Sequence, residues 1–159
     1  MRYAYPCSIV IDEEELKETG REGYVVSFPD VYGANTGGYS WDEAVEMADD
    51  CLGLALGFYF DKGEDIPTPS PPAEGQVVIP VPPLVAAKLT VYTAMREQGM
   101  TTRALAEKLG LTEEAVGKLL DPAYRTHFSQ VEKALRAVGR SLVVEDAPVA
   151  KPALAPVAS

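Results

Sequence analysis

The side chains most able to do chemistry in this sequence are carboxylates, and they gather in the first half of the chain. Residues 1–80 carry 16 acidic and 4 basic side chains, a net charge of −12, whereas residues 81–159 carry 8 acidic and 10 basic ones. Paired carboxylates can hold Mg²⁺ for phosphoryl transfer. Here the acids occupy a short run at residues 12–15 and one face of an expected helix, so they do not converge on one point. An exposed acidic face is therefore favoured over a metal site.

Nucleophiles and metal ligands lack the partners that catalysis needs. His127 is the sole histidine, no serine or cysteine stands in an evident nucleophile motif, and Cys7 and Cys51 form neither a C-x-x-C pair nor a Cys/His cluster. Gly37-Gly38 is not followed by the Lys-Ser/Thr of a phosphate-binding loop. We therefore expect no catalytic residue, no metal and no cofactor, and a protein that is not an enzyme. The lack of an apolar leader or membrane span, with thiols read as reduced, favours the cytoplasm.

A cluster of prolines divides the chain. Seven of the thirteen prolines fall within residues 67–83, a composition typical of a semi-rigid linker. The predicted domains are therefore residues 1–80 and 84–145, followed by a disordered Ala/Pro/Val-rich tail over 146–159. Inside the linker, residues 76–79 are apolar and β-branched, which is consistent with a strand that returns to the first domain's sheet. The acidic first domain suits a basic partner, whereas the mildly basic second domain suits phosphate.

The first domain is predicted to be α+β, with a small antiparallel sheet covered by one helix. Apolar residues that alternate with polar ones indicate strands with one buried face. The strands are expected at residues 3–11, 24–28 and 34–39. The acidic run between the first two is expected to form a turn together with residues 20–23. Ser40 and Glu43 make a capping box for an amphipathic helix that ends at residues 61–63.

The second domain is predicted to be all-α. A helix over residues 84–98 begins after a Pro-Pro pair and stops at Gly99. Thr102 then caps a short helix, Gly110 forms a turn, and Thr112 caps a second short helix. This spacing resembles the helix-turn-helix of phage-repressor type, in which the second helix faces the bases. An αα-hairpin in a bundle that does not bind DNA is the alternative.

Two further elements are expected after this helix pair. Ser129 and Glu132 form a capping box for a last helix, and residues 141–144 are apolar enough to form a short strand. An exposed apolar strand edge favours self-pairing, so we expect a homodimer or a higher homo-oligomer.

The residues expected to face DNA come from the helix pair and the loop after it. They are Thr102, Arg103, Thr112, Glu113, Glu114, Gly117, Lys118 and Arg125. The second helix offers two glutamates against one lysine, and a glutamate can either accept a hydrogen bond from cytosine or simply complement the helix dipole. Affinity for each copy should therefore be modest, and useful binding needs two or more copies on a repeated half-site.

Several short motifs extend across both domains: Gly23–Asp30, Ser40–Ala44 and Gly63–Pro67 in the first, then Asp121-Pro122 and Leu135–Leu142 in the second. Through them, residues 1–145 resemble a HicB-type antitoxin of HicA/HicB toxin–antitoxin pairs. The resemblance implies a partial ribonuclease-H-like fold without nuclease activity, which masks a small mRNA-cleaving HicA-type toxin. It also implies a C-terminal domain that represses the pair's own operon. Residues 31–34 and the acidic second helix depart from the family's pattern.

The charge of the first domain agrees with that implied role. A toxin that cleaves RNA must present a positive surface to phosphate, and an acidic domain can compete for that surface. The expected toxin contacts are Asp30, Tyr32, Tyr39, Asp42, Glu46, Asp49 and Asp50. The expected partners are thus a basic HicA-like toxin and operator DNA, with no membrane. Two other functions stay open: a stand-alone repressor whose α+β domain senses a small ligand, and an acidic metal-dependent nuclease.

Overall fold

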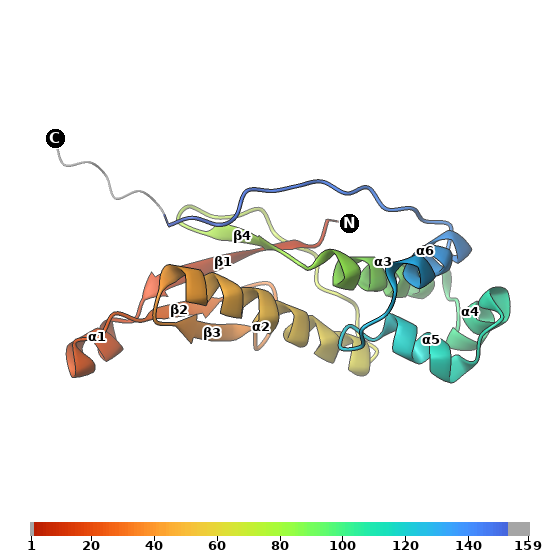
Figure 1. Ribbon diagram of the computed structural model, residues 1–159, viewed down its shortest axis with the longest axis horizontal. Coiled ribbons are helices and arrows are strands. Elements are labelled where there is room, and N and C mark those ends of the chain that lie inside the picture. Colours follow the sequence, from red (N-terminus) through yellow and green to blue (C-terminus); the bar gives the residue numbers. More distant parts are fainter. Residues whose placement is uncertain (1, 153–159) are drawn as a thin grey trace. The chain divides into compact units, whose positions relative to one another are not determined.

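The computed structural model describes residues 2–152, which divide into two compact units. The sheet unit comprises residues 2–52, 68–80 and 147–152, and the helical unit comprises residues 53–67 and 81–146. The elements, in chain order, are β1 (Ala4–Ile11), α1 (Glu13–Thr19), β2 (Tyr24–Ser27), β3 (Asn35–Gly38), α2 (Trp41–Asp61), β4 (Val77–Pro80), α3 (Pro83–Gln98), α4 (Thr102–Leu109), α5 (Glu113–Leu120) and α6 (Phe128–Ala137) (Figure 1). The predicted α+β class is confirmed. Among the residues described, no helix is long and apolar enough to cross a membrane.

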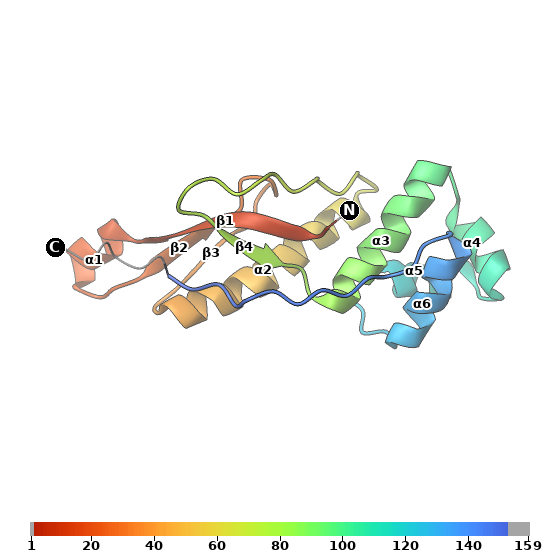
Figure 2. The same ribbon diagram turned by 90° about the horizontal axis from the view of Figure 1, so that it is seen from above.

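The four strands form one antiparallel sheet in the order β3-β2-β1-β4 (Figures 1 and 2). Ile9 of β1 lies opposite Val26 of β2, and Tyr5 of β1 lies opposite Ile79 of β4. Because cross-strand partners point to the same side of a sheet, these four side chains share one face. All four are buried. The strand expected to return from the Pro-rich segment is therefore confirmed as β4.

The first half of α2 covers this buried face of the sheet. Ser40 Oγ accepts a hydrogen bond from the N–H of Glu43 (3.1 Å), and the Glu43 carboxylate accepts one from the N–H of Tyr39 (2.7 Å). The predicted capping box is thus present, with its second bond one residue earlier than usual. The helix then buries Ala44, Ala48 and Leu52.

The glycine pair in β3 has a packing reason that its sequence does not reveal. A Cβ atom on Gly38 would lie 2.7 Å from the backbone nitrogen of Ala44 in α2, and one on Gly37 would lie 2.6 Å from the carbonyl oxygen of Tyr24. No side chain fits at either distance. The two glycines, which weaken the strand prediction, therefore allow β3 to approach its neighbours.

The acidic run after β1 forms the helix α1, so the predicted turn is wrong. Asp12 caps this helix: its carboxylate accepts hydrogen bonds from the N–H groups of Glu14 and Glu15, each at 3.1 Å. Gly20 ends it with φ at 71°. Glutamates in the first turn complement the helix dipole, which offsets their mutual repulsion. Because α1 buries no residue, apolar spacing gives no sign of it.

The helices α3 to α6 enclose one apolar core in the helical unit. α3 packs against α5 and α6, and α4 packs against the same two helices. The most buried members of the core are Ala87, Val91, Leu105, Val116, Val131, Ala134 and Leu135. This arrangement agrees with the predicted all-α second domain.

The segment after α2 is fastened to α3 by polar contacts. The Tyr92 hydroxyl donates to the carbonyl of Glu64 (2.8 Å), and Arg96 donates to the Asp65 carboxylate and to the Gly63 carbonyl, both at 2.6 Å. The ring of Tyr92 also meets Phe60 edge-on. Residues 63–65 of the family-like motif thus make defined contacts within the helical unit.

Three predictions near the C-terminus are wrong. Thr101, not Thr102, caps α4, because its hydroxyl accepts the N–H of Ala104 at 3.0 Å. Ser129 lies inside α6, whose cap position is His127 without a side-chain bond. Residues 141–144 form no strand, and Val143 and Val144 are 92% and 79% exposed. The strand-edge argument for a dimer is lost with that strand.

The tail has regular structure nowhere between residues 141 and 152. Leu142 packs against the core of the helical unit, and in the sheet unit the Trp41 indole N–H donates to the carbonyl of Ala150 at 3.1 Å. The rest of the tail predicted to be disordered, residues 153–159, lies outside the described residues.

Candidate functional site

The strongest charged feature of the chain is a row of acids on α2. Asp42, Glu46 and Asp50 are exposed and Asp49 is half-buried, and no lysine or arginine occurs between Trp41 and Asp61. Residues four apart are neighbours on a helix surface, so the helix brings these four predicted contacts together. Nothing on α2 itself neutralises their charge, and the row attracts cations.

Asp49 shows that crowding acids on α2 disfavours the ionised form of a carboxyl group. Burial raises the pKa of its carboxyl above the ordinary value, and the neighbouring charges of Asp50 and Glu46 raise it further. The same carboxylate lies near the buried thiol of Cys7, whose pKa is raised to about 12, first by burial and then by Asp49. The helix thus holds its negative charges closer together than stability alone favours.

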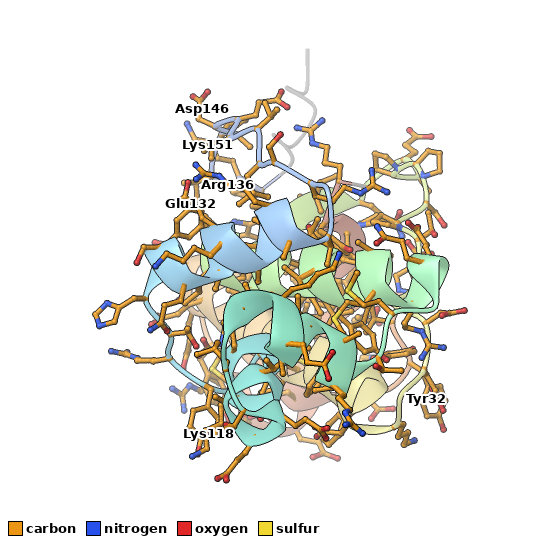
Figure 3. The ribbon with its side chains drawn as sticks, turned by 90° about the vertical axis from the view of Figure 1, so that its right-hand side faces the viewer. Tyr32, Lys118, Glu132, Arg136, Asp146 and Lys151 are labelled. Carbon is orange, nitrogen blue, oxygen red and sulfur yellow. The ribbon has the colours of Figure 1, made fainter. Side chains whose placement is uncertain are left out.

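The other predicted toxin contacts lie outside α2. Asp30 follows β2 and binds the Pro-rich segment, since its two carboxylate oxygens accept hydrogen bonds from the Ser70 N–H (2.8 Å) and hydroxyl (2.7 Å). Tyr32 is 92% exposed and projects from the ribbon (Figure 3). The ring of Tyr39 is covered by the Arg21 guanidinium, 3.6 Å from its centroid. Asp30 therefore has a structural partner, and Tyr32 is among the most exposed large side chains described.

Exposed apolar side chains accompany the acids on α2, and sequence analysis missed them. Met47, Leu54 and Phe58 are 40%, 67% and 64% exposed. The spacing of these residues is visible in the sequence, because residues seven and four positions apart return to the same side of a helix. The sequence does not show that this side is exposed, because an apolar residue in an amphipathic helix is ordinarily assigned to the core.

The described residues offer little to a metal or a nucleophile mechanism. They contain no group of three or more potential metal ligands from histidine, cysteine, aspartate and glutamate. The Cys51 thiol is half-buried, has its pKa raised by burial, and donates to the Asn35 carbonyl at 3.5 Å. His127 stands at the start of α6. The carboxylates of α2 thus lie on an open helix face and do not form a coordination sphere.

The second candidate surface is built by α4, α5 and the loop after α5. Gly110 links the two helices with φ at 67°, and the Thr112 hydroxyl accepts the N–H of Ala115 at 3.1 Å, so the predicted cap of the second helix is present. Leu105, Ala106 and Val116 pack inward. The small side chain of Ala106 suits the close approach of the two helices.

Several charges predicted to face DNA are paired within their own helices. Lys118 projects from α5 (Figure 3) and lies 3.6 Å from Glu114, and Arg103 of α4 lies 3.5 Å from Glu107. Exposed pairs of this kind contribute only about 0.3–0.5 kcal/mol, so a phosphate can displace them. Glu113 and Glu114 lie in the first turn of α5, where they complement the helix dipole. Gly117 leaves open space on the same helix.

A groove of about 410 Å³ runs beside α5. Its basic lining residues are Lys118, Arg125, His127 and Lys133, and its apolar floor includes Leu111 and Leu119. Among the described residues that line it there is no aspartate or glutamate. The groove therefore adds Lys133 to the cationic surface that Lys118 and Arg125 begin, and it also contains His127.

A buried lysine holds the loop that carries Arg125. Lys88 of α3 is fully buried, and its ammonium group donates to the carbonyls of Asp121 (2.9 Å) and Tyr124 and to the hydroxyl of Thr126 (2.8 Å). Burial lowers the pKa of Lys88, and the charge of Asp121 opposes that effect. Sequence analysis missed this residue, which stands among apolar positions of α3.

The part of the chain that contains the sheet and α2 is similar to a known protein family. The family described as HicB_like antitoxin of bacterial toxin-antitoxin system matches residues 4–90, more than half of the chain. The chain belongs to the HicB-like antitoxin family. The motif-based resemblance is therefore confirmed. The HicB-like match includes β1 to β4 and α2, which carry the predicted toxin contacts, and it ends within α3.

Relatives with the same family name extend the similarity over most of the chain. Antitoxin HicB 1 of Photorhabdus laumondii is 38% identical over 129 residues, which cover 81% of this chain and 82% of that protein. Antitoxin HicB of Escherichia coli K12 is 36% identical over 120 residues, covering 76% and 87%. Antitoxin HicB of Pseudomonas fluorescens is 32% identical over 108 residues, covering 67% and 74%.

Proposed function

We propose that this chain is a non-enzymatic cytoplasmic antitoxin that binds and neutralises a HicA-like, mRNA-cleaving toxin through residues 1–80. The observation that carries the proposal is the uncompensated row of acids on α2. A protein that cleaves RNA must offer cations to phosphate. The same cations attract the α2 acids, so the antitoxin competes with RNA for one surface. The exposed ring of Tyr32 adds an aromatic contact of the kind enriched in interfaces.

We propose further that residues 84–145 bind operator DNA and repress the operon. The groove beside α5 supports this, since Arg125 and Lys133 offer phosphate contacts that the acidic start of α5 does not. Most affinity for phosphate is electrostatic and falls steeply with salt. Because each copy offers few cations, we expect a homodimer or higher oligomer on a repeated half-site. Binding of the operon's upstream DNA, titrated at several salt concentrations, tests this part.

Charge reversal on α2 tests toxin binding. The double variant Glu46→Lys/Asp50→Lys places two cations within the acid row, and its association rate with the toxin at low salt should fall at least about tenfold. The rate should also lose most of its salt dependence. Stopped-flow mixing with a catalytically inactive toxin measures both effects. Co-expression with the active toxin should show weaker growth rescue.

The matched control is Glu13→Lys/Glu14→Lys on α1, which reverses two exposed acids on the other acidic helix. It makes the same change in net charge but leaves α2 intact, so it should keep most of the association rate. Equal losses in the two variants would mean that net charge alone matters, and the α2 surface would be wrong. If the unaltered chain formed no complex and rescued no growth, a ligand-sensing repressor would become the better assignment.

A further inference from the structure

The exposed face of α2 carries an apolar strip beside its acids. Met47, Leu54 and Phe58 follow one another at spacings of seven and four residues, which places them in one line on the helix, with Asp50 of the acid row between the first two. We call the three apolar residues the α2 strip. Its two most exposed members, Leu54 and Phe58, expose 67% and 64% of their surface. All three belong to one continuous helix, so helical geometry alone fixes their order.

Resting on the proposed function, we propose that the α2 strip is the apolar anchor of the toxin interface, with Leu54 and Phe58 inserted into the cationic toxin's surface. Interfaces derive most of their affinity from a few buried apolar or aromatic side chains, whereas charges at the rim mainly govern the association rate. The α2 strip and the acid row beside it have these two parts. Asp42 and Glu46 steer the partner, and Leu54 and Phe58 hold it.

The backbone beside the strip leaves room for a partner. Gly53 and Gly57 lie next to Leu54 and Phe58, and a Cβ atom added to either would meet nothing within 4 Å. Glycine inside a helix lowers stability relative to alanine, and no contact among the described residues requires it here. The two glycines therefore leave the backbone next to Leu54 and Phe58 uncovered by side chains of their own.

Charge selects the occupant of this surface. α2 carries six acidic residues, five of them between Asp42 and Asp50, and no basic one, so the α2 helix of a second copy would add acids to a surface that is already acidic. A partner whose cationic surface has an apolar centre would complement both the acid row and the apolar strip of α2. The toxin of the proposed function is the partner with that chemistry.

The test separates apolar anchoring from charge. Leu54→Glu adds one more acid beside the row: if charge alone binds the toxin, affinity rises, whereas loss of an anchor lowers it. We expect the latter, with dissociation of the complex faster by on the order of 30-fold, and a similar loss for Phe58→Gln. Phe58→Leu should retain most of the affinity. Dissociation is followed with a catalytically inactive HicA-type toxin on a biosensor surface.

Leu16→Glu is the control, since Leu16 is also an exposed leucine in an acidic helix, α1. It should leave the dissociation rate within about twofold of the unaltered chain. Matching free energies of unfolding show that the variants stay folded, as expected for substitutions at exposed positions. Tighter binding by Leu54→Glu, or unchanged binding by Phe58→Gln, overturns the anchor while leaving the proposed function intact.

Two other occupants would also overturn the proposal. A fall in the oligomeric mass of Phe58→Gln with full toxin binding would assign the strip to a second copy. A rise in the exposure of Phe58 after deletion of residues 153–159, again with full toxin binding, would assign it to the chain's own terminus. If the unaltered chain bound no toxin at all, the proposed function and the anchor would fail together.

Discussion

Some charged side chains of this protein lower the stability of the fold that holds them. Asp49 is the clearest case, because burial and two neighbouring acids raise the pKa of its carboxyl. The folded protein therefore binds this proton more tightly than the unfolded chain does. Stability falls as pH rises through the interval above the ordinary aspartate value, and the penalty is complete once Asp49 is ionised in the fold.

Replacing Asp49 with asparagine removes this pH-dependent penalty. Asp49→Asn should increase the free energy of unfolding at pH 7 and change it little at pH 3, where the carboxyl is protonated in both states. Urea unfolding at the two pH values measures the difference, and Asp42→Asn, at an exposed position of the same helix, is the control. A stabilisation of equal size at both pH values would show that ionisation is not its cause. Toxin association should weaken in the same variant.

Residue-scale features were the hardest to predict from sequence. Lys88 stands at an inward position of α3, where a lysine ordinarily breaks the apolar pattern, and only the folded loop supplies its three acceptors. The spacing of Leu54 and Phe58 was readable in the sequence, but only the fold shows that both side chains are exposed. The acid row itself was readable, since charge needs no tertiary information.

Elements were largely predictable because their signals are local. The strands, α2, α3 and the α4–α5 pair follow from alternation, helical spacing and caps. α1 was missed because it has no buried face, and the strand expected at residues 141–144 does not form because apolar residues alone do not supply a pairing partner. β4 was expected from only four apolar residues, and its pairing with β1 depends on a partner some seventy residues away in the chain.

The loop between α5 and α6 depends on one side chain of another helix. Lys88→Met would leave the Tyr124 carbonyl without its donor and the Asp121 carbonyl with only the N–H of Tyr124, at a cost of about 2 kcal/mol in the free energy of unfolding, reduced where water can replace the ammonium group. Chemical denaturation measures this cost. Lys133→Met, which removes an exposed lysine of α6, should change stability by less than about 0.5 kcal/mol. If the two variants unfolded alike, the buried ammonium would have no role in holding the loop.

At the scale of the whole molecule, the chain passes from the sheet unit into the helical unit over residues 53–67 and returns to the sheet before α3 begins. β4 supplies Ile79 to the sheet core, and only Val81 and Pro82 separate it from α3. The Pro-rich stretch therefore connects residues 53–67 of the helical unit back to the sheet. The strand expected within this stretch is β4, which pairs with β1.

Truncation at either side of β4 tests this organisation. A fragment ending at Pro72 lacks β4, so it exposes Tyr5 and leaves the edge of β1 unpaired, which favours aggregation. A fragment ending at Pro82 keeps the complete sheet. We expect the longer fragment to unfold cooperatively on heating and the shorter one to elute as aggregates in size-exclusion chromatography. Equal behaviour of the two fragments would contradict an essential role for β4.

The pairing of β4 with β1 also determines whether the two fragments would separate if the backbone were cut between α2 and β4. Residues 64–73 have no regular structure, and a protease that cut among the prolines would produce two polypeptides. They would not separate at once, because β4 would remain hydrogen-bonded along β1. A nicked molecule of this kind is a two-chain protein, whose fragments stay together through the β1–β4 ladder and through the contacts of Tyr92 and Arg96 with residues 63–65.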